Sequence, residues 1–406
     1  MNLKQLIATV LMFAFCAALL LAGCSPAPNP SPSPSQSAPA SNPSLSPVPS
    51  APVDPPPSPS PVKMADLAIG YTFTNHHAPL VIAAAKGDAF ADKGVYFKEV
   101  LEKEKYILVA NGVDIANIDL IVSNAGGDVI SLLEMGHINV GLKSIGLPIA
   151  SIDQGSALKV LGPLHVDGFG LVASNEMPAD NFDEFLAYVQ DSPEPVKIGY
   201  NAPNNSPVIL FAESCRELGL TVSEDPMDLT ADILMVNLRG TTTLIPALTS
   251  GEVDAWVGPS PFPELAVLNN AGKLIIDLRD LPPSGRWTDF ACCVVTVTED
   301  NLAENREALE YLYKLLTVSA EFANANKDEA GQIVADWTGV DVEAAKNTMT
   351  VFTTAVTQSW LDHAALTYSV LQSNGVLKGA FADKDMSEVM DQIFDLSVFE
   401  NAKTLP

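Results

Sequence analysis

Short apolar runs alternate with helical stretches between residue 64 and about residue 300. The runs have the length and composition of buried strands, and apolar residues at three- and four-residue spacing follow most of them. Strand–helix alternation of this kind is typical of α/β proteins with mainly parallel sheets. The predicted strands cover residues 66–73, 95–100, 120–123, 138–142, 158–162, 169–173, 196–200, 233–238, 253–257 and 274–277.

Beyond residue 300 the pattern changes to helices alone, with apolar residues at helical spacing. A strand at 291–298 precedes these helices and is expected to return the chain to the first part of the fold. The predicted C-terminal helices cover residues 302–326, 329–337, 342–352, 360–373 and 387–394.

The chain contains an internal repeat, in which residues 132–148 resemble residues 247–263. In each copy an apolar helix end stops at a glycine, Gly136 or Gly251, the residue type that tolerates the left-handed conformation of a helix C-cap. A strand follows, and a turn rich in glycine, serine and proline then starts a new helix. Each copy therefore predicts a helix–strand–turn–helix unit of an open α/β sheet.

The two repeated turns, at 143–147 and 258–262, are candidate ligand walls, because ligands of open α/β sheets bind outside the carboxyl ends of the strands. Because each repeated half contributes one such turn, we predict two lobes with a ligand bound between them. The boundaries of the lobes are expected at glycine-containing crossovers. The first lobe is predicted to combine residues 64–167 and 286–406, and the second to cover 168–285.

Residues 1–23 are predicted to be a signal peptide. Lys4 precedes an apolar run over 6–22, and residues 21–24 read Leu-Ala-Gly-Cys. This tetrapeptide resembles the lipobox of bacterial lipoproteins, in which the cysteine becomes the lipidated N-terminus. We therefore expect Cys24 to anchor the protein by lipid outside the cytoplasm. An uncleaved signal anchor is the alternative, because about 17 apolar residues can just span a bilayer.

Residues 24–63 are predicted to be a proline- and serine-rich tether. Between residues 25 and 62 there are 15 prolines in 38 residues, and only Asp54 is charged. Such a segment cannot build a core, and it extends by about 3.1 Å per residue where it is polyproline-like, for a reach on the order of 100 Å. A glycosylated stalk is the alternative, and it would leave the spacing role unchanged.

The net charge of −27 argues against nucleic acid as a partner, since phosphate binding needs clustered lysine and arginine. Beyond Cys24 the cysteines are Cys215, Cys292 and Cys293, and an odd number of scattered thiols is not a disulfide framework. Cys215 lies on the apolar side of a predicted helix, and we expect it to be a small buried hydrophobe.

Polar residues follow several predicted strands at their carboxyl ends, where a ligand between the lobes is expected to bind. A turn that opens a helix offers free N–H groups to an anion, and in the second lobe Ser206 is expected to cap a helix that Pro207 starts. For each asparagine or serine a plain cap or turn is the alternative interpretation. The candidate ligand-binding residues are Phe73, Thr74, Asn75, His76, His77, Asn124, Gly126, Lys143 and Ser144 in the first lobe, and Tyr200, Asn201, Asn204, Ser206, Ser260 and Phe262 in the second.

The pairs His76-His77 and Cys292-Cys293 raise the question of a metal site. Adjacent residues in extended chain point to opposite sides, so each pair is expected to offer one inward ligand, which is too few for a closed zinc site. We therefore predict no metal. His165 and His363 are expected to be ordinary surface or core residues.

The order of segments resembles the solute-binding proteins of bacterial ABC transporters of the nitrate, sulfonate and taurine group. The residues that carry the resemblance are 78–87, 247–255 and the two strands that begin Gly136-His-Ile-Asn and Gly251-Glu-Val-Asp. The resemblance implies a two-lobed α/β periplasmic-binding-protein fold of type II, here with C-terminal helices. It also implies a monomer without a cofactor or catalytic residues, which closes on a small molecule and delivers it to permease and ATPase subunits.

Two departures from that group leave the ligand class open. Gly87-Asp-Ala-Phe replaces the usual Gly-Tyr/Phe-Phe, and residues 258–261 replace a Trp-Glu-Pro turn. Residues 289–298 and Gly141-Leu-Lys143 also resemble the thiamine-pathway pyrimidine synthases, in which that lysine holds pyridoxal phosphate. A pyridoxal-phosphate-linked or metal-dependent enzyme is therefore the alternative function. Against it, Leu147 stands where those enzymes have a reactive histidine.

Overall fold

The computed structural model describes residues 64–123 and 128–406. The predicted signal peptide and tether, with Cys24, lie outside these residues, as do the candidate ligand-binding residues Asn124 and Gly126. Among the helices of the described part, none is both long enough and apolar enough to cross a membrane.

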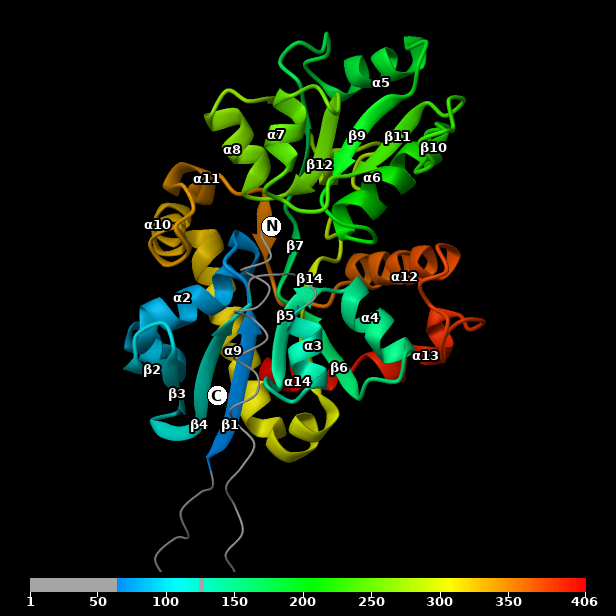
Figure 1. Cartoon of the computed structure of the whole chain (residues 1–406). Coiled ribbons are helices and arrows are strands. Elements are labelled where there is room, and N and C mark those ends of the chain that lie inside the picture. The colour runs from blue at the N-terminus through cyan, green and yellow to red at the C-terminus, as the bar shows by residue number, and fades with distance from the viewer. Residues whose placement is uncertain (1–63, 124–127) are drawn as a thin grey trace, which may run out of the picture. The chain divides into compact units, whose positions relative to one another are not determined.

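A seven-stranded sheet forms the first of two α/β lobes and lies in the lower part of Figure 1. The central strand β1 pairs in parallel with β4 and with β5, whereas β14 runs antiparallel to both of its neighbours. The spatial order is β2 (Val95–Leu101), β3 (Lys105–Ala110), β4 (Val113–Val122), β1 (Ala65–Tyr71), β5 (Val140–Ser144), β14 (Cys293–Thr298) and β6 (Leu158–Pro163).

Helices cover both faces of this sheet, because successive strand residues point to opposite sides and both sides are apolar. On β14, Val294 packs with one helix group while Val295 and Val297 belong to the core on the other face. One face carries α3 (Asp128–Glu134), α4 (Gly146–Asp153), α12 (Gln358–Ser373) and α13 (Met386–Ile393). The other carries α2 (Ala78–Lys86), α9 (Glu299–Ala325), α10 (Lys327–Thr338) and α14 (Ser397–Ala402).

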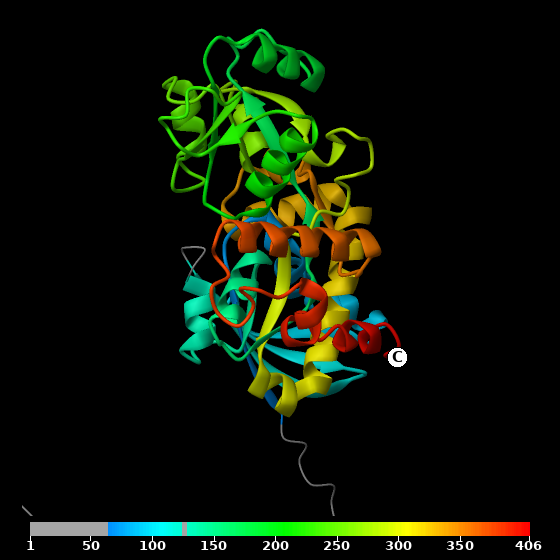
Figure 2. The same ribbon diagram turned by 90° about the vertical axis from the view of Figure 1, so that its right-hand side faces the viewer.

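A six-stranded sheet forms the second lobe, and Figure 2 shows it turned by 90° above the first. On β12 the fully buried Trp256 packs under α7 and α8, while Ala255 and Val257 face α5 and α6. The strand order is β10 (Val222–Ser223), β11 (Ile233–Asn237), β9 (Val196–Tyr200), β12 (Ala255–Pro259), β8 (Phe169–Ala173) and β13 (Lys273–Asp277). The helices are α5 (Phe182–Asp191), α6 (Ser206–Glu217), α7 (Leu244–Thr249) and α8 (Phe262–Leu268).

Two segments carry the chain between the sheets. The outward segment contains β7 (His165–Asp167) and turns at Gly168 into β8, and the return segment leads from η3 (Leu278–Asp280) to β14. The two segments touch through an isolated bridge between Val166 and Ala291. We call the region around these two segments, where the lobes meet, the lobe junction. The remaining short elements are η1 (Asn75–His77), η2 (Gly87–Lys93), α11 (Val342–Lys346) and β15 (Thr350–Phe352).

The repeated helix–strand unit forms as predicted. α3 and α7 each end before a glycine in the left-handed region, with φ of 71° at Gly136 and 74° at Gly251. The N–H groups of the two glycines donate to the carbonyls of Leu133 and Leu248, which closes the last turn of each helix. Cys215 is fully buried as expected, and burial raises its pKa to about 12.

Three predictions about secondary structure were wrong. The helix expected over 342–352 ends at Lys346, because residues 350–352 form β15 and pair with β7. The strand predicted over 120–123 is only the end of β4, which joins β3 in a hairpin whose turn residues Asn111 and Gly112 both have positive φ. The sheets are mixed and not mainly parallel, because this hairpin and the strands that follow the crossovers, β8 and β14, all pair antiparallel.

Gly168 provides a test of how tightly the outward segment packs. Its φ is 86°, and a Cβ added there would lie 2.5 Å from Oγ1 of Thr350 on β15. Gly168→Ala should therefore lower the free energy of unfolding by about 1–2 kcal/mol for the left-handed backbone and by about 1–3 kcal/mol more for the clash. Chemical denaturation measures the loss.

Gly285→Ala is the matched control, because Gly285 lies in the return segment with φ of 78° and an added Cβ there would have no atom of the described residues within 4 Å. It should show the backbone cost alone. Equal losses for the two variants would contradict the close approach of Thr350 to Gly168.

Candidate ligand site at the lobe junction

Two of the predicted ligand-binding serines, one from each lobe, meet at the lobe junction. Ser144 is the last residue of β5, and Ser206 is the first residue of α6. Their hydroxyl oxygens lie 3.5 Å apart, and the Ser206 hydroxyl donates to the carbonyl of Ala291 at 2.8 Å. Polar groups from the first lobe, the second lobe and the return segment therefore converge at this point.

Ser206 does not cap α6 as predicted. Asn205 occupies the N-cap position without a side-chain cap bond, and Pro207 lies in the first turn. The reason is that the Ser206 hydroxyl binds Ala291 across the junction and is not directed along its own helix. A residue that reads as a local cap in the sequence thus makes a contact between distant segments.

The turn before α6 also contacts the first lobe. Asn204 adopts φ of 59°, and its side-chain oxygen accepts a hydrogen bond from Asn374 at 3.3 Å. Its carbonyl oxygen approaches Gly146 at the start of α4, where an added Cβ would lie 3.2 Å away. Asn201 is 9% exposed, and its Oδ1 has no hydrogen-bond partner among the described residues. This acceptor is the group in the turn that a polar ligand could satisfy.

In the first lobe, the residues after β1 form η1, and Thr74 caps it by accepting a hydrogen bond from the N–H of His76. His77 is buried, and its Nδ1 accepts from the N–H of Thr72 at 3.0 Å. Burial lowers the pKa of His77, and contact with Cys293 opposes this. Residues 75–77 form a 3-10 helix and not the extended chain on which the expectation of one inward histidine was based, and both His76 and His77 contact Cys293.

Asn75 and Phe73 lie against other parts of the first lobe. The Asn75 amide is buried, has no partner in the described part of the chain, and lines a cavity of about 20 Å³ beside α9 and α10. That volume is roughly enough for one water molecule. Phe73 is 50% exposed and packs its ring edge against Tyr71.

Three of the predicted ligand-binding residues of the second lobe make contacts inside the protein. The Tyr200 hydroxyl donates to Glu224 near β10, and Phe262 packs partly buried against the α7–β12 core. Ser260 is fully buried, and its hydroxyl donates to Glu264 at 2.6 Å. The structure therefore gives Ser260 a partner inside the protein, beside the outward segment.

The sequence interpretation missed His165, which lies fully buried in β7 with its ring 4.3 Å from that of His76. It also placed Cys292 and Cys293 on opposite sides, whereas their sulfurs are 3.9 Å apart and both face His76. The alternation fails because β14 starts only at Cys293, so the Cys292 backbone is not part of regular strand. No local spacing signals this cluster, since its members flank two crossovers.

The electrostatics of the cluster follow from burial. Burial lowers the pKa of His76 to about 4. Hydrogen bonding by Cys292 holds the pKa of the Cys293 thiol well below its ordinary value, while burial raises the pKa of the Cys292 thiol. The charge of Lys143 acts against that increase at Cys292, which places this predicted residue at the edge of the cluster. The cluster therefore favours the deprotonated form of Cys293 and the neutral form of His76.

A larger cavity, of about 830 Å³, lies at the opposite ends of the strands of the seven-stranded sheet, away from the candidate site. It is lined by residues where β1, β5 and β6 begin and by the acidic side chains of Glu134, Asp300 and Glu304. Ligands of open α/β sheets bind at the carboxyl ends of the strands, so this cavity is separate from the candidate site.

A family model described as NMT1-like matches residues 60–340. The chain belongs to the NMT1-like family. The chain is also 35% identical over 103 residues to the uncharacterized protein MJ1180 of Methanocaldococcus jannaschii. The match covers 25% of this chain and 71% of that protein.

Solved structures share the fold of this NMT1-like chain at low sequence identity. The zinc-bound ligand-binding component of an ABC-type import system from Staphylococcus aureus has a TM-score of 0.62 at 15% identity, over 84% of this chain and 99% of that one. The nitrate-binding protein NrtA of Synechocystis PCC 6803 has 0.60 at 15%, over 84% and 88%. The aliphatic sulphonate-binding protein SsuA of Escherichia coli has 0.58 at 15%, over 83% and 93%. The predicted periplasmic-binding-protein fold and the resemblance drawn from the sequence are confirmed.

Glu264 links Ser260 to the segment after α11 and predicts a pH dependence. Its Oε1 accepts hydrogen bonds from the Ser260 hydroxyl and from the N–H of Met349 at 2.9 Å. Its Oε2 is buried without a partner among the described residues. Burial raises the pKa of Glu264, and the charge of Asp277 adds to the increase.

Folding therefore favours the protonated form of Glu264. Its contribution to the free energy of unfolding is full below the ordinary pKa of 4.5 and is lost as the pH rises through the raised value. Glu264→Gln should stabilise the protein at pH 7 and flatten the decline in stability above pH 4.5. Urea denaturation across this range measures both effects. The exposed Glu176→Gln should change neither, and an unchanged slope in Glu264→Gln would contradict the prediction.

Proposed function

We propose that this chain is the extracytoplasmic solute-binding component of an ABC importer, which captures a small organic ligand between two lobes and delivers it to a permease. Membership of the NMT1-like family supports this proposal. So does the fold shared with proteins described as the ligand-binding component of an ABC import system and as nitrate- and sulphonate-binding proteins.

The observation that carries the proposal is the meeting of Ser144 and Ser206 across the lobe junction. A ligand can favour a closed state only if it contacts both lobes, because binding to one lobe gives no difference in affinity between open and closed states. Ser144 offers a hydroxyl from the first lobe, and Oδ1 of Asn201, which has no partner in the part of the chain that the structure describes, offers an acceptor from the second. We infer that the lobes are divided as the sequence predicts, at 64–167 with 286–406 and at 168–285.

We further propose that the protein acts without catalysis and without pyridoxal phosphate. Lys143 is half-buried at the end of β5, near Cys292 and His77. Its position next to Ser144 suits a charged contact to a polar or anionic ligand. The pyrimidine-synthase alternative would require the same lysine to hold the cofactor, so the two functions are separated by one measurement on this residue.

The ligand test uses the full chain. Native mass spectrometry should detect one co-purified small molecule per chain, and nitrate, ethanesulfonate and 4-aminopyrimidine serve as added probes in thermal unfolding. A true ligand should stabilise the protein as RT ln(1 + [L]/Kd), by about 2.7 kcal/mol at a hundredfold excess over Kd, and should remain chemically unchanged.

Ser144→Ala and Asn201→Ala should each weaken that binding by about 1–3 kcal/mol, because a buried ligand group loses its partner. The exposed Asn269→Ala is the control and should bind like the wild type. Wild-type affinity in both junction variants would contradict capture between the lobes. Visible absorbance of a lysine-bound pyridoxal phosphate, lost in Lys143→Ala, would instead favour the enzyme.

The proposed lipid anchor has its own test. Cys24→Ala should release the protein from the membrane without changing its ligand affinity, because the lipid would be attached only to that cysteine. Fractionation after an alkaline carbonate wash measures the release. A variant that stays in the membrane fraction would show that residues 6–22 act as a signal anchor.

A further inference from the structure

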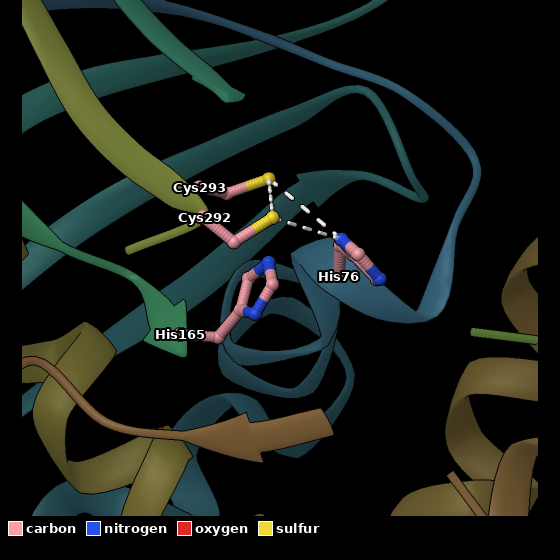
Figure 3. Close-up of side chains that lie close together, drawn as sticks. All are labelled: His76, His165, Cys292 and Cys293. Carbon is pink, nitrogen blue, oxygen red and sulfur yellow. Dashed lines mark hydrogen bonds between the residues drawn. The ribbon is translucent and has the colours of Figure 1, made fainter. Parts of the chain in front are cut away.

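Four buried side chains from three separate segments direct nitrogen and sulfur atoms at one point. They are His76 in η1, His165 in β7, and Cys292 and Cys293 at the start of β14. One ligand atom from each lies within 4.8 Å of all the others, and each residue is less than 9% exposed. Figure 3 shows the two sulfurs and the two rings arranged around a common centre.

The spacing fits tetrahedral coordination. Bond lengths of about 2.3 Å to sulfur and about 2.0–2.1 Å to nitrogen set edges of roughly 3.8 Å between two sulfurs and roughly 3.5 Å between sulfur and nitrogen. The Sγ atoms of Cys292 and Cys293 are 3.9 Å apart, and Nδ1 of His76 is 3.6 Å and 3.9 Å from them. Three of the four ligand atoms therefore stand at coordination distances from one another, and a small inward shift of the His165 nitrogen, which lies within 4.8 Å of the others, completes the set.

The hydrogen bonding of His165 leaves its Nε2 available to bind a metal ion. Its Nδ1 contacts the carbonyl of Val166 at 3.4 Å, so this nitrogen carries the proton. Its Nε2 is buried without a hydrogen-bond partner among the described residues, and the ring nitrogen nearest the sulfurs in Figure 3 is this one. A ligating histidine commonly donates its other N–H to a backbone carbonyl, as His165 does.

We propose that His76, His165, Cys292 and Cys293 bind a thiophilic d10 cation, with Zn²⁺ as its representative, in a closed four-ligand site. Two thiolates and two neutral imidazoles neutralise a divalent charge, which a buried site requires. All four positions come from the protein, so the ion has a structural role and leaves no open position for chemistry. It ties the outward and return segments to the end of β1.

This site is independent of the proposed function. It rests on side chains of the first lobe and of the two crossover segments, and it would form whether or not the chain serves an importer. Measurements on the purified protein alone therefore test it, and their failure would leave the transport proposal untouched.

The test uses the full chain, stripped of metal and kept reduced with a phosphine. Titration with Zn²⁺ against a chromophoric chelator should show one tightly bound equivalent, and Zn²⁺ should raise the unfolding temperature. Co²⁺ should give the absorption of a tetrahedral ion with thiolate-to-metal charge transfer, which reports sulfur ligands directly.

Cys293→Ser and His165→Gln should each lower the Zn²⁺ affinity by at least about 100-fold, because loss of an outer-shell partner alone costs about 10- to 100-fold. Cys293→Ser should also weaken the cobalt charge-transfer band, whereas His165→Gln should keep it. The controls are Cys215→Ser and His363→Gln, which remove a buried thiol and a buried imidazole outside the cluster and should bind like the wild type.

The proposal is overturned if the reduced wild type binds no stoichiometric Zn²⁺. It is also overturned if Cys293→Ser and His165→Gln bind as tightly as the controls. If Cys293→Ser does not fold, the loss of affinity in His165→Gln and the cobalt spectrum of the wild type decide the question.

Discussion

Two segments carry the chain between its sheets, and the backbone polar groups of their buried parts must find partners away from water. Backbone groups of the two segments form hydrogen bonds with each other. The N–H of Asp167 donates to the carbonyl of Phe290 at 3.1 Å, the N–H of Phe290 returns to the Asp167 carboxylate at 2.8 Å, and the N–H of Leu164 donates to the carbonyl of Cys293 at 2.9 Å. Burial raises the pKa of Asp167 to about 6, although these amide contacts favour its charged form. The position of the lobe junction depends on this pairing.

Aromatic ring contacts connect the return segment to the C-terminal helix α12. The ring of Phe169, the first residue of β8, meets that of Phe290 in the return segment edge to face at 6.4 Å. His363 of α12 lies 4.8 Å from the Phe290 ring, and its nitrogens contact the carbonyls of Arg286 and Asp289. The return segment is therefore packed against α12 as well as against the start of β8, and such packing holds nearby polar groups in place for recognition.

The fold was predictable where local chemistry determines the structure. A glycine after an apolar helix end gave the correct helix ends at Gly136 and Gly251, because only the left-handed backbone is needed there. The helix at 342–352 failed because three residues of it gain a strand partner that is distant in sequence. The hairpin at Asn111-Gly112 was predictable from the turn residues alone and was missed.

The site was predictable only in outline. Strand ends indicated Ser144 and Ser206, whose hydroxyls lie together at the lobe junction, since open α/β sheets carry their ligand-binding groups at the carboxyl ends of the strands. Their role in ligand binding stays a prediction. The partners of Tyr200 and Ser260 were not predictable, because Glu224 and Glu264 reach them through the local shape of turns. The histidine–cysteine cluster depends on how two crossings pack, and no sequence period encodes that.

The strand order has a consequence for how the chain is made. β14 lies between β5 and the edge strand β6, so β6 cannot join the first sheet until residues 293–298 have been synthesised. All six strands of the second sheet lie between residues 169 and 277, in one uninterrupted stretch. The second lobe can therefore complete its sheet on the ribosome while the first is still unfinished, and the first lobe closes around the chain that returns from its neighbour.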